Sequence, residues 1–312
     1  MVIYRYPSKE KLNIPECVMA LGFFDGVHIA HRDLINRAYT TAKEKGLAFG
    51  IFTFRSSGKI KSDAGRLYSD SEKAEIFEQL GADFTVYADF DAISSCSAED
   101  FVKTILFADL SCRICVAGFN FRFGNRAAGD SALLTRLMKK LGGEVRICEE
   151  ITADGRTMSA TLIRNLISEG KIEDANAYLG APYYIKGRVS KGRMDGRKIG
   201  FPTVNIPIEE GRVIPRLGVY RSALIIDGKI YSGVSNIGVC PTFDGEEIRL
   251  ETHIIDFSAD MYGRELRVYL LGFLREERRF DSIEELKKQI EMDKNTTIKE
   301  NGEIEWHQLG LK

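Results

Sequence analysis

The chain has 312 residues, of which 44% are hydrophobic and 29% charged, and its formal net charge is −1. This length exceeds the usual range of one domain, so two domains are expected, and the near-neutral charge argues against a general nucleic-acid or membrane-surface binder. No apolar run approaches the roughly 20 residues that span a bilayer, and the N-terminus lacks the apolar core of a signal peptide. We therefore expect a cytoplasmic protein without nucleic-acid or membrane partners, as a monomer or a weak homo-oligomer.

The first half alternates between strand-like and helix-like segments. This alternation predicts a parallel sheet covered by helices, with ligands bound at the carboxyl ends of the strands. The predicted strands cover residues 17–21, 47–54, 84–87, 113–117 and 144–148. The predicted helices begin with a helical pattern around residues 34–42 and continue with residues 71–80, 97–107 and 131–141.

Residues 21–31 lie between the first predicted strand and the first predicted helix. They combine a glycine-bearing turn with two of the four histidines of the chain, His28 and His31. The spacing of i, i+3 places both imidazoles on one side of the first helical turn. Unpaired N–H groups and the positive end of the helix dipole would point at an anion there. Two ordinary surface histidines are the alternative, but the glycine turn favours a phosphate site.

Cys112 and Cys115 have the spacing of a metal-binding or redox pair, among six scattered cysteines. No second pair or nearby histidine completes a zinc site. Residues three apart in a strand point to opposite faces. We therefore expect buried thiols.

After Pro182 the sequence changes to short β-rich segments without long helices between them. Asp227-Gly228 predicts a two-residue hairpin turn. The segments predict a small antiparallel barrel, closed by one amphipathic helix led by Asp281 and Ser282. Two short helical patterns at 160–180 form the connection, so the predicted domains are 1–182 and 183–312. The predicted strands cover residues 184–189, 201–206, 219–226, 229–234, 249–255 and 266–271.

A glycine-rich basic segment opens the second half. Gly192, Gly196 and Gly200 recur at four-residue spacing, with Arg193, Arg197 and Lys198 between them. Glycines let backbone amides approach an anion, and the basic side chains neutralise it. Taken alone, the segment is also compatible with a mobile basic hairpin loop.

Thr203 and Asn205 enter the next strand and project from the same face. Two hard oxygens beneath a phosphate loop suit Mg²⁺ held jointly with nucleotide phosphates, unless they satisfy local backbone groups. Glu251 and His253 share a face of a later strand. A carboxylate that points into the mouth of the barrel would accept the proton of a substrate hydroxyl attacking a γ-phosphate. An outward-facing salt-bridge partner is the equal alternative.

Together these phrases resemble the bifunctional bacterial riboflavin kinase/FAD synthetase (FMN adenylyltransferase) family over nearly the whole chain. Gly196-Arg-Lys-Ile-Gly-Phe-Pro-Thr-Val-Asn205 is similar to the family's GR-x-lGFPTAN signature, and residues 236–243, 250–257 and 274–280 carry further phrases in the same order. The resemblance implies a barrel that phosphorylates riboflavin with ATP to give FMN and ADP. It implies Mg²⁺–ATP at Thr203 and Asn205, a base at Glu251, ATP contacts at Gly192, Arg197, Gly200 and Pro202, and flavin contacts at Arg275 and Phe280.

The first half resembles the family's adenylyltransferase domain, related in fold to nucleotidyltransferases with a His-x-Gly-His motif. The implied fold is therefore a nucleotidyltransferase-type Rossmann-like sheet with helices, followed by the β-barrel. Residues 118–124 and 159–164 resemble two further family phrases. In such enzymes the FMN phosphate attacks the α-phosphorus of ATP, giving FAD and pyrophosphate. The implied catalytic residues are His28 and His31, and the implied nucleotide-binding residues are Gly22, Phe23, Asp25, Gly26, Asn120, Arg122, Gly124, Ser159, Thr161 and Arg164.

Two features of the first half depart from the family pattern. Ala30 stands where the motif has glycine, and Arg55-Ser-Ser-Gly58 replaces a Pro-His-Pro turn. An added methyl group costs roughly 1–3 kcal/mol in a tightly packed site. A riboflavin kinase with a weakened or inactive first domain is therefore one alternative. A flavin-binding regulatory protein without turnover is another, although the intact metal pair and base argue against it.

Overall fold

The computed structural model describes residues 1–55, 65–153, 156–192, 195–242 and 245–305. The chain forms two compact units, Met1–Ala160 and Thr161–Lys312. Helix α7 (Ile172–Leu179) and nearly all of α6 (Ala160–Ser168) therefore fall in the second unit, although the predicted first domain extends to residue 182. Within those described ranges, no helix combines the length and apolar character that crossing a membrane requires.

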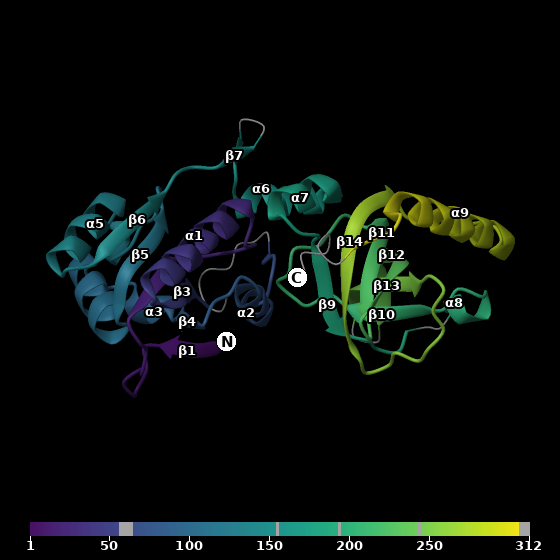
Figure 1. Ribbon diagram of the computed structural model, residues 1–312. Coiled ribbons are helices and arrows are strands. Elements are labelled where there is room, and N and C mark those ends of the chain that lie inside the picture. The colour runs from purple at the N-terminus through teal and green to yellow at the C-terminus, as the bar shows by residue number, and fades with distance from the viewer. Residues whose placement is uncertain (56–64, 154–155, 193–194, 243–244, 306–312) are drawn as a thin grey trace. The chain divides into compact units, whose positions relative to one another are not determined.

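The first unit contains a six-stranded sheet in the order β1-β4-β3-β2-β5-β6, with every neighbouring pair parallel (Figure 1). The predicted alternation is confirmed, and the sheet gains an edge strand, β1, that was not predicted. Every residue of β2 and β4 is buried, as expected for a parallel sheet covered on both faces. The strands are β1 (Val2–Tyr6), β2 (Cys17–Leu21), β3 (Ala48–Phe54), β4 (Phe84–Ala88), β5 (Cys112–Gly118) and β6 (Glu144–Cys148).

The α-helices of the parallel-sheet region begin at side-chain caps, whereas its π-helix and 3₁₀-helix do not. The Oγ of Ser97 accepts a hydrogen bond from the backbone N–H of Asp100 at 3.0 Å, so the predicted start at residue 97 is confirmed. That predicted helix is a short α-helix continued by a π-helix. The elements are α1 (Ile29–Lys45), α2 (Asp70–Gln79), α3 (Phe90–Ile93), α4 (Ala98–Asp100), the π-helix η1 (Phe101–Asp109), the 3₁₀-helix η2 (Asn125–Ala127), α5 (Ser131–Lys140) and the small hairpin β7 (Thr152–Ala153) and β8 (Arg156–Thr157).

The strand order reverses beside β2. Strands β3 and β4 lie on one side of β2, and β5 and β6 lie on the other. In such sheets ligands bind in the crevice at the carboxyl ends of the strands where the order reverses. Residues 22–31 follow β2 and residues 118–130 follow β5, so the two predicted nucleotide segments leave the sheet at this place.

The prediction that Cys112 and Cys115 point to opposite faces is wrong. The pairing of β2 with β5 shifts from Cys17↔Cys112 to Val18↔Ile114, so β5 carries one extra residue at a bulge. The bulge returns both thiols to one face, where their sulfur atoms lie 3.4 Å apart. Both are free and buried, as expected. Across the described parts of the chain, no cluster of histidine, cysteine and carboxylate side chains could hold a metal.

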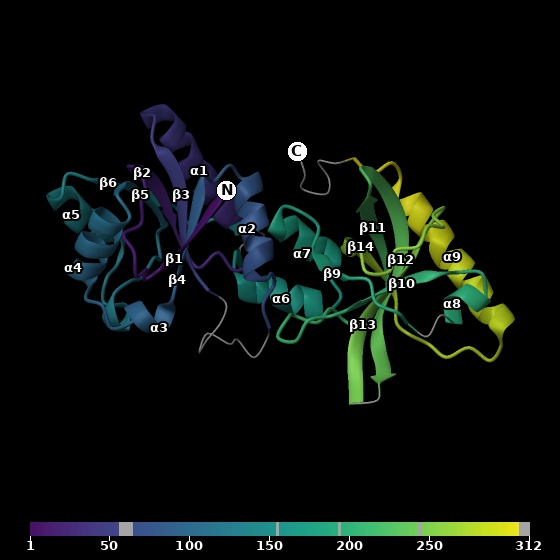
Figure 2. The ribbon, with the colours of Figure 1, turned by 90° about the horizontal axis from the view of Figure 1, so that it is seen from below.

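The second unit is an almost closed antiparallel barrel in the order β10-β13-β12-β11-β14-β9 (Figure 2). A bridge between Ser190, just after β9, and Asn205 of β10 links the two ends of this order. The predicted barrel is therefore confirmed. The strands are β9 (Tyr184–Arg188), β10 (Thr203–Pro207), β11 (Gly218–Ile226), β12 (Lys229–Thr242), β13 (Gly245–Ile254) and β14 (Glu265–Arg275).

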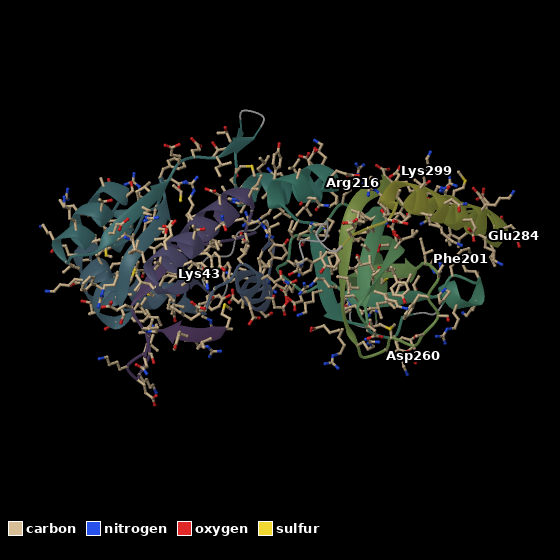
Figure 3. The ribbon with its side chains drawn as sticks, in the orientation of Figure 1. Lys43, Phe201, Arg216, Asp260, Glu284 and Lys299 are labelled. Atoms are coloured by element: carbon tan, nitrogen blue, oxygen red, sulfur yellow. The ribbon has the colours of Figure 1, made fainter. Side chains whose placement is uncertain are left out.

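Turns and one long helix complete the barrel. Asp227 and Gly228 have φ of 48° and 78° and join β11 to β12, so the predicted hairpin turn is confirmed. Helix α9 (Ile283–Asn301) begins at Ser282, whose Oγ accepts from the N–H of Glu285 at 3.1 Å. It packs against β11 and β12, and Figure 3 shows Glu284 and Lys299 toward its two ends.

Candidate active sites

The turn between β2 and α1 has a strained and firmly held backbone. Phe24 and Val27 are fully buried and have φ of 49° and 42°, a region that costs free energy for such side chains. A Cβ at Gly22 would lie 2.7 Å from the ring of Phe24, so this position requires glycine. From β3, the hydroxyl of Thr53 donates to the carbonyl of Phe23 at 2.9 Å. The turn therefore presents the start of α1 in one conformation.

His28 and His31 lie at the N-terminus of α1 with their rings stacked, 3.7 Å between centroids. His28 is the N-cap, and its Nδ1 accepts from the N–H of His31 at 3.4 Å. A neutral His28 therefore carries its proton on Nε2, where it can donate. Burial lowers the pKa of His28 to about 4, and burial and the neighbouring His28 lower the pKa of His31 well below its ordinary value. The pair is neutral at physiological pH, and Nδ1 of His31 is buried without a hydrogen-bond partner.

The other predicted nucleotide residues are distributed over three places. Asn120 and Arg122 are exposed on the loop after β5, beside the strand that leads to the histidines. Gly124 has φ of 72° and packs so closely that a Cβ would lie 2.8 Å from the backbone nitrogen of Ala98. The turn itself holds Gly22, Phe23, Asp25 and Gly26. Ser159 lies near the end of the first unit, and Thr161 and Arg164 belong to the second.

Three phenylalanines lie at the same edge of the sheet, of which Phe23 was predicted as a site residue and Phe54 and Phe90 were not. Phe23 follows β2, Phe54 ends β3 and Phe90 follows β4. Their ring centroids are 5.4 Å apart for Phe23 and Phe54, and 5.5 Å for Phe54 and Phe90. Phe23 is 39% exposed and Phe90 is 42% exposed. They form an apolar surface suited to a flat aromatic ring. The sequence signal that could have predicted this surface is the aromatic residue at the end of each of three successive strands.

The two departures from the family pattern lie at this edge. Ala30 is half-buried in the first turn of α1, where the backbone is regularly helical and accepts a Cβ. Arg55 follows β3, and its N–H donates to the carbonyl of Ala88 at 3.2 Å. Ser56, Ser57 and Gly58 lie outside the described residues.

In the second unit, β10 and β13 place four polar side chains on one face. The register pairs Asn205 with Glu251 and Thr203 with His253. Nδ2 of Asn205 donates to Oγ1 of Thr203 at 3.4 Å, which confirms that these two share a face. On the other side of β13, Asn236 of β12 is the partner of Glu251. Asn205, Glu251 and Asn236 therefore form a row across three strands, called the polar row below.

The sequence left two orientations open for Glu251, and its side chain lies on the outer face of the barrel. Its neighbours Leu250 and Thr252 are fully buried, and side chains alternate between faces, so Glu251 lies on the outer face. The interior instead holds a chain of hydroxyl groups. Ser222 and Ser235 are 2.7 Å apart, and Ser235 and Thr252 are 2.8 Å apart.

Asn205 is only 5% exposed, and its Oδ1 is buried without a hydrogen-bond partner. Gly192 leaves space above this oxygen, because a Cβ at that position would lie 2.5 Å from it. Oγ1 of Thr203 is the adjacent hard oxygen. An unsatisfied amide oxygen beside a hydroxyl, next to a position that requires glycine, is a donor set that fits Mg²⁺.

The described part of the glycine-rich segment contains the short helix α8 (Asp195–Lys198), and a turn follows it. A Cβ at Gly196 would clash with the carbonyl of Phe201, and Gly200 has φ of 94°. Nδ1 of His253 lies 3.0 Å from the carbonyl oxygen of Pro202 and holds the turn against β13. Arg197 and Lys198 are exposed, whereas Arg193 lies outside the described residues.

The loop between β14 and α9 covers part of the polar row. Arg275 pairs with the buried carboxylate of Asp293 on α9 at 2.8 Å and lies over the ring of Phe280, 5.8 Å from its centroid. Glu277 accepts a hydrogen bond from Nδ2 of Asn236 at 2.8 Å. Sequence reasoning singled out Arg275 and Phe280 but missed Glu277, and also Asn236. No local pattern marks these two, because they lie 41 residues apart in the chain.

Comparisons with known proteins divide the chain in the same way. Residues 10–162 match the family described as FAD synthetase, and residues 179–300 match the family described as riboflavin kinase. Two similar proteins are named bifunctional riboflavin kinase/FMN adenylyltransferase. The one from Bacillus subtilis is 34% identical, and the match covers 90% of this chain and 92% of that protein. The one from Listeria monocytogenes is 38% identical, and the match covers 90% of this chain and 91% of that protein. A crystal structure of a protein named macrolide-efflux protein from Streptococcus pneumoniae is 30% identical, with a TM-score of 0.86 over 95% of this chain and 99% of that one.

Proposed function

The chain belongs to the family of bifunctional riboflavin kinase/FMN adenylyltransferases, and we propose that its two units carry one activity each. The second unit converts riboflavin and ATP to FMN and ADP. The first unit joins FMN to the adenylyl group of ATP, giving FAD and pyrophosphate. The observation that carries this proposal is the pairing of Asn205 with Glu251, because it supports a candidate metal ligand and a candidate base on neighbouring strands.

In the kinase reaction, Glu251 accepts the proton of the riboflavin 5′-hydroxyl as that oxygen attacks the γ-phosphorus of ATP. The bond between the γ-phosphorus and the bridging oxygen breaks, and ADP leaves. The register puts Asn205 opposite Glu251, so phosphates held at Asn205 lie next to the activated hydroxyl. Gly192, Arg197, Gly200 and Pro202 contribute the adjoining ATP contacts, and Arg275 and Phe280 border the flavin.

Mg²⁺ is part of the proposal for this unit. Oγ1 of Thr203 and the unsatisfied Oδ1 of Asn205 would hold it together with the ATP phosphates. When bound, the ion would neutralise the charge that develops on the β- and γ-phosphates. The neighbouring carboxylates, Glu251 and Glu277, repel phosphate, so a cation at this place also makes ATP binding favourable.

In the adenylyltransferase reaction, a phosphate oxygen of FMN attacks the α-phosphorus of ATP, and pyrophosphate leaves. Negative charge accumulates, so the site needs donors rather than a nucleophilic side chain. The neutral His28 and His31 and the first N–H groups of α1 supply donors at the end of β2. Asn120 and Arg122 line the nucleotide from the loop after β5. The exposed rings of Phe23 and Phe90 offer the flavin an apolar surface beside them.

The test is to incubate the full chain with Mg²⁺ and ATP and with either riboflavin or FMN, and to separate the flavins by chromatography. We expect FMN from riboflavin and FAD from FMN. FMN without FAD would establish the alternative of a kinase alone, which the Ala30 and Arg55-Ser-Ser-Gly58 departures favour. Flavin binding without either product would establish the regulatory protein.

A cytoplasmic location and a monomeric or weakly oligomeric state complete the proposal, with no nucleic-acid or membrane partner. They rest on the net charge of −1 and the ordinary composition. Size-exclusion chromatography with light scattering tests the oligomeric part.

A further inference from the structure

Cys240 lies on the outer face of β12, four residues beyond Asn236 and therefore on the same side of the strand. Gly238, between them, leaves that face open, and a Cβ there would crowd the carboxylate of Glu277. Although Asn236 is the register partner of Glu251, the Glu251 side chain reaches further along the sheet. Its Oε1 lies 3.7 Å from Sγ of Cys240, within hydrogen-bond distance for sulfur.

The thiol is the donor in this contact. A carboxylate has only acceptors, whereas a protonated thiol has one hydrogen to give. Burial and the negative charge of Glu251 raise the pKa of Cys240, so it keeps its proton at neutral pH. The contact therefore directs a weak donor at one oxygen of the candidate base.

Several described side chains near Glu251 carry a charge or titrate, and each has a contact of its own. Arg249, two residues earlier on β13, directs its guanidinium to Glu247 at 2.6 Å. Glu277, from the loop after β14, accepts from Asn236 and adds negative charge. The histidine two residues further along β13 has its Nδ1 at a backbone carbonyl, 3.0 Å away. From β10, the facing side chains are uncharged.

We propose that Cys240 is a positioning residue for the kinase reaction, whose thiol donates to Oε1 of Glu251 and holds the base in place above Gly238. This inference rests on the proposed function, in which Glu251 is the base. A hydrogen bond that fixes the rotamer of Glu251 keeps its carboxylate within reach of the substrate hydroxyl.

The experiment compares Cys240→Ala and Cys240→Ser in the full chain, with kcat and KM of both reactions measured from about pH 5.5 to about pH 9. Net hydrogen-bond energies correspond to roughly 2–10-fold in rate. We expect Cys240→Ala to lower the kinase kcat by this factor across the pH range and to leave the KM for ATP unchanged. Cys240→Ser keeps a donor and restores most of the loss.

Cys96 is the matched control, because it is likewise a partly exposed free thiol but lies in the first unit. Cys96→Ala is expected to leave the kinase profile unchanged. Thermal unfolding checks that each variant folds, and Cys240→Val replaces Cys240→Ala if that variant does not. A Cys240→Ala profile that superimposes on that of the unsubstituted chain, or a serine variant as impaired as the alanine variant, overturns the inference.

Glu251→Gln, assayed in parallel, separates this inference from the proposed function. If Glu251→Gln keeps its kinase activity, Glu251 is not the base and both proposals fail. If Glu251→Gln is inactive while Cys240→Ala is normal, only the role of Cys240 is rejected.

Discussion

The candidate phosphate sites of the two units are built in opposite ways. In the first unit the candidate phosphate-binding groups lie at the ends of secondary-structure elements. They come from the turn after β2, the N-terminus of α1 and the loop after β5. In the second unit they come from alternate positions on neighbouring antiparallel strands. A site at strand ends depends on special backbone conformations such as those of Phe24 and Val27. A site on strands depends on register, which many backbone hydrogen bonds hold at once.

The charges of the two sites differ as well. The stacked histidines are neutral, so they accept an anion without first needing a cation. The polar row instead contains the carboxylate of Glu251, and its Asn236 contacts the carboxylate of Glu277. If the proposed function holds, the kinase site would need a cation for ATP to bind, whereas the adenylyltransferase site would carry its donors in the protein. Substitutions should therefore affect one reaction at a time.

The largest expected effect comes from Glu251→Gln. Loss of a general base lowers the rate by roughly 10²–10⁴-fold. We expect that loss in FMN formation from riboflavin and no change in FAD formation from FMN, measured by flavin chromatography. Glu247→Gln is the matched control on the same face of β13, and its kinase rate should stay within about threefold of normal. Equal loss of both activities in Glu251→Gln would refute the assignment of one reaction to each unit.

His31→Ala should have the next largest effect, on the other reaction. It removes a ring that stacks on His28 at 3.7 Å and a polar group at the helix N-terminus. Removing one donor for developing charge costs roughly 10²–10³-fold. We expect that loss in FAD formation and an unchanged kinase rate. The control is Arg37→Ala, an exposed position on α1 that pairs with Asp33. A parallel loss in the kinase reaction would contradict the comparison.

Much of this arrangement was predictable, because its signals are local. The buried strand β2, the Asp227-Gly228 turn and the spacing of Thr203 and Asn205 each need only a few neighbouring residues. The alternation of side chains between the two faces of a strand also predicted that Glu251 and His253 share a face.

Whether the face of β13 that carries Glu251 and His253 points into or out of the barrel was not predictable. Leu250 and Thr252, on either side of Glu251, are one apolar and one polar residue, and which face turns inward depends on pairing with β10 and β12. The bulge that brings Cys112 and Cys115 together is likewise a property of the pairing with β2. Glu277 reaches Asn236 only because the barrel places distant segments side by side.

The lowered pKa values of His28 and His31 predict that acid lowers the free energy of unfolding of the first unit. His28 has a folded pKa of about 4 against an ordinary value of 6.5, so the folded state disfavours its protonated form. The free energy of unfolding is therefore highest above about pH 6.5 and falls by about 3 kcal/mol as the pH drops to about 4, with His31 acting in the same direction. Urea unfolding of the full chain at several pH values measures this slope. His28→Asn keeps an N-cap but cannot titrate, so its slope should be shallower; equal slopes would contradict the prediction.

Ala30→Gly should have the smallest effect, and it sharpens the comparison because it restores the family's residue at the strand-end site. The backbone at Ala30 is helical and already accepts a Cβ, so we expect the KM for ATP in FAD formation to change by less than about threefold. Helix α1 should lose about 1 kcal/mol of stability, seen as earlier thermal unfolding. Thr40→Gly, at an exposed position of the same helix, controls for that loss. A rise in kcat/KM of roughly tenfold in Ala30→Gly alone would instead show that the methyl group obstructs the nucleotide.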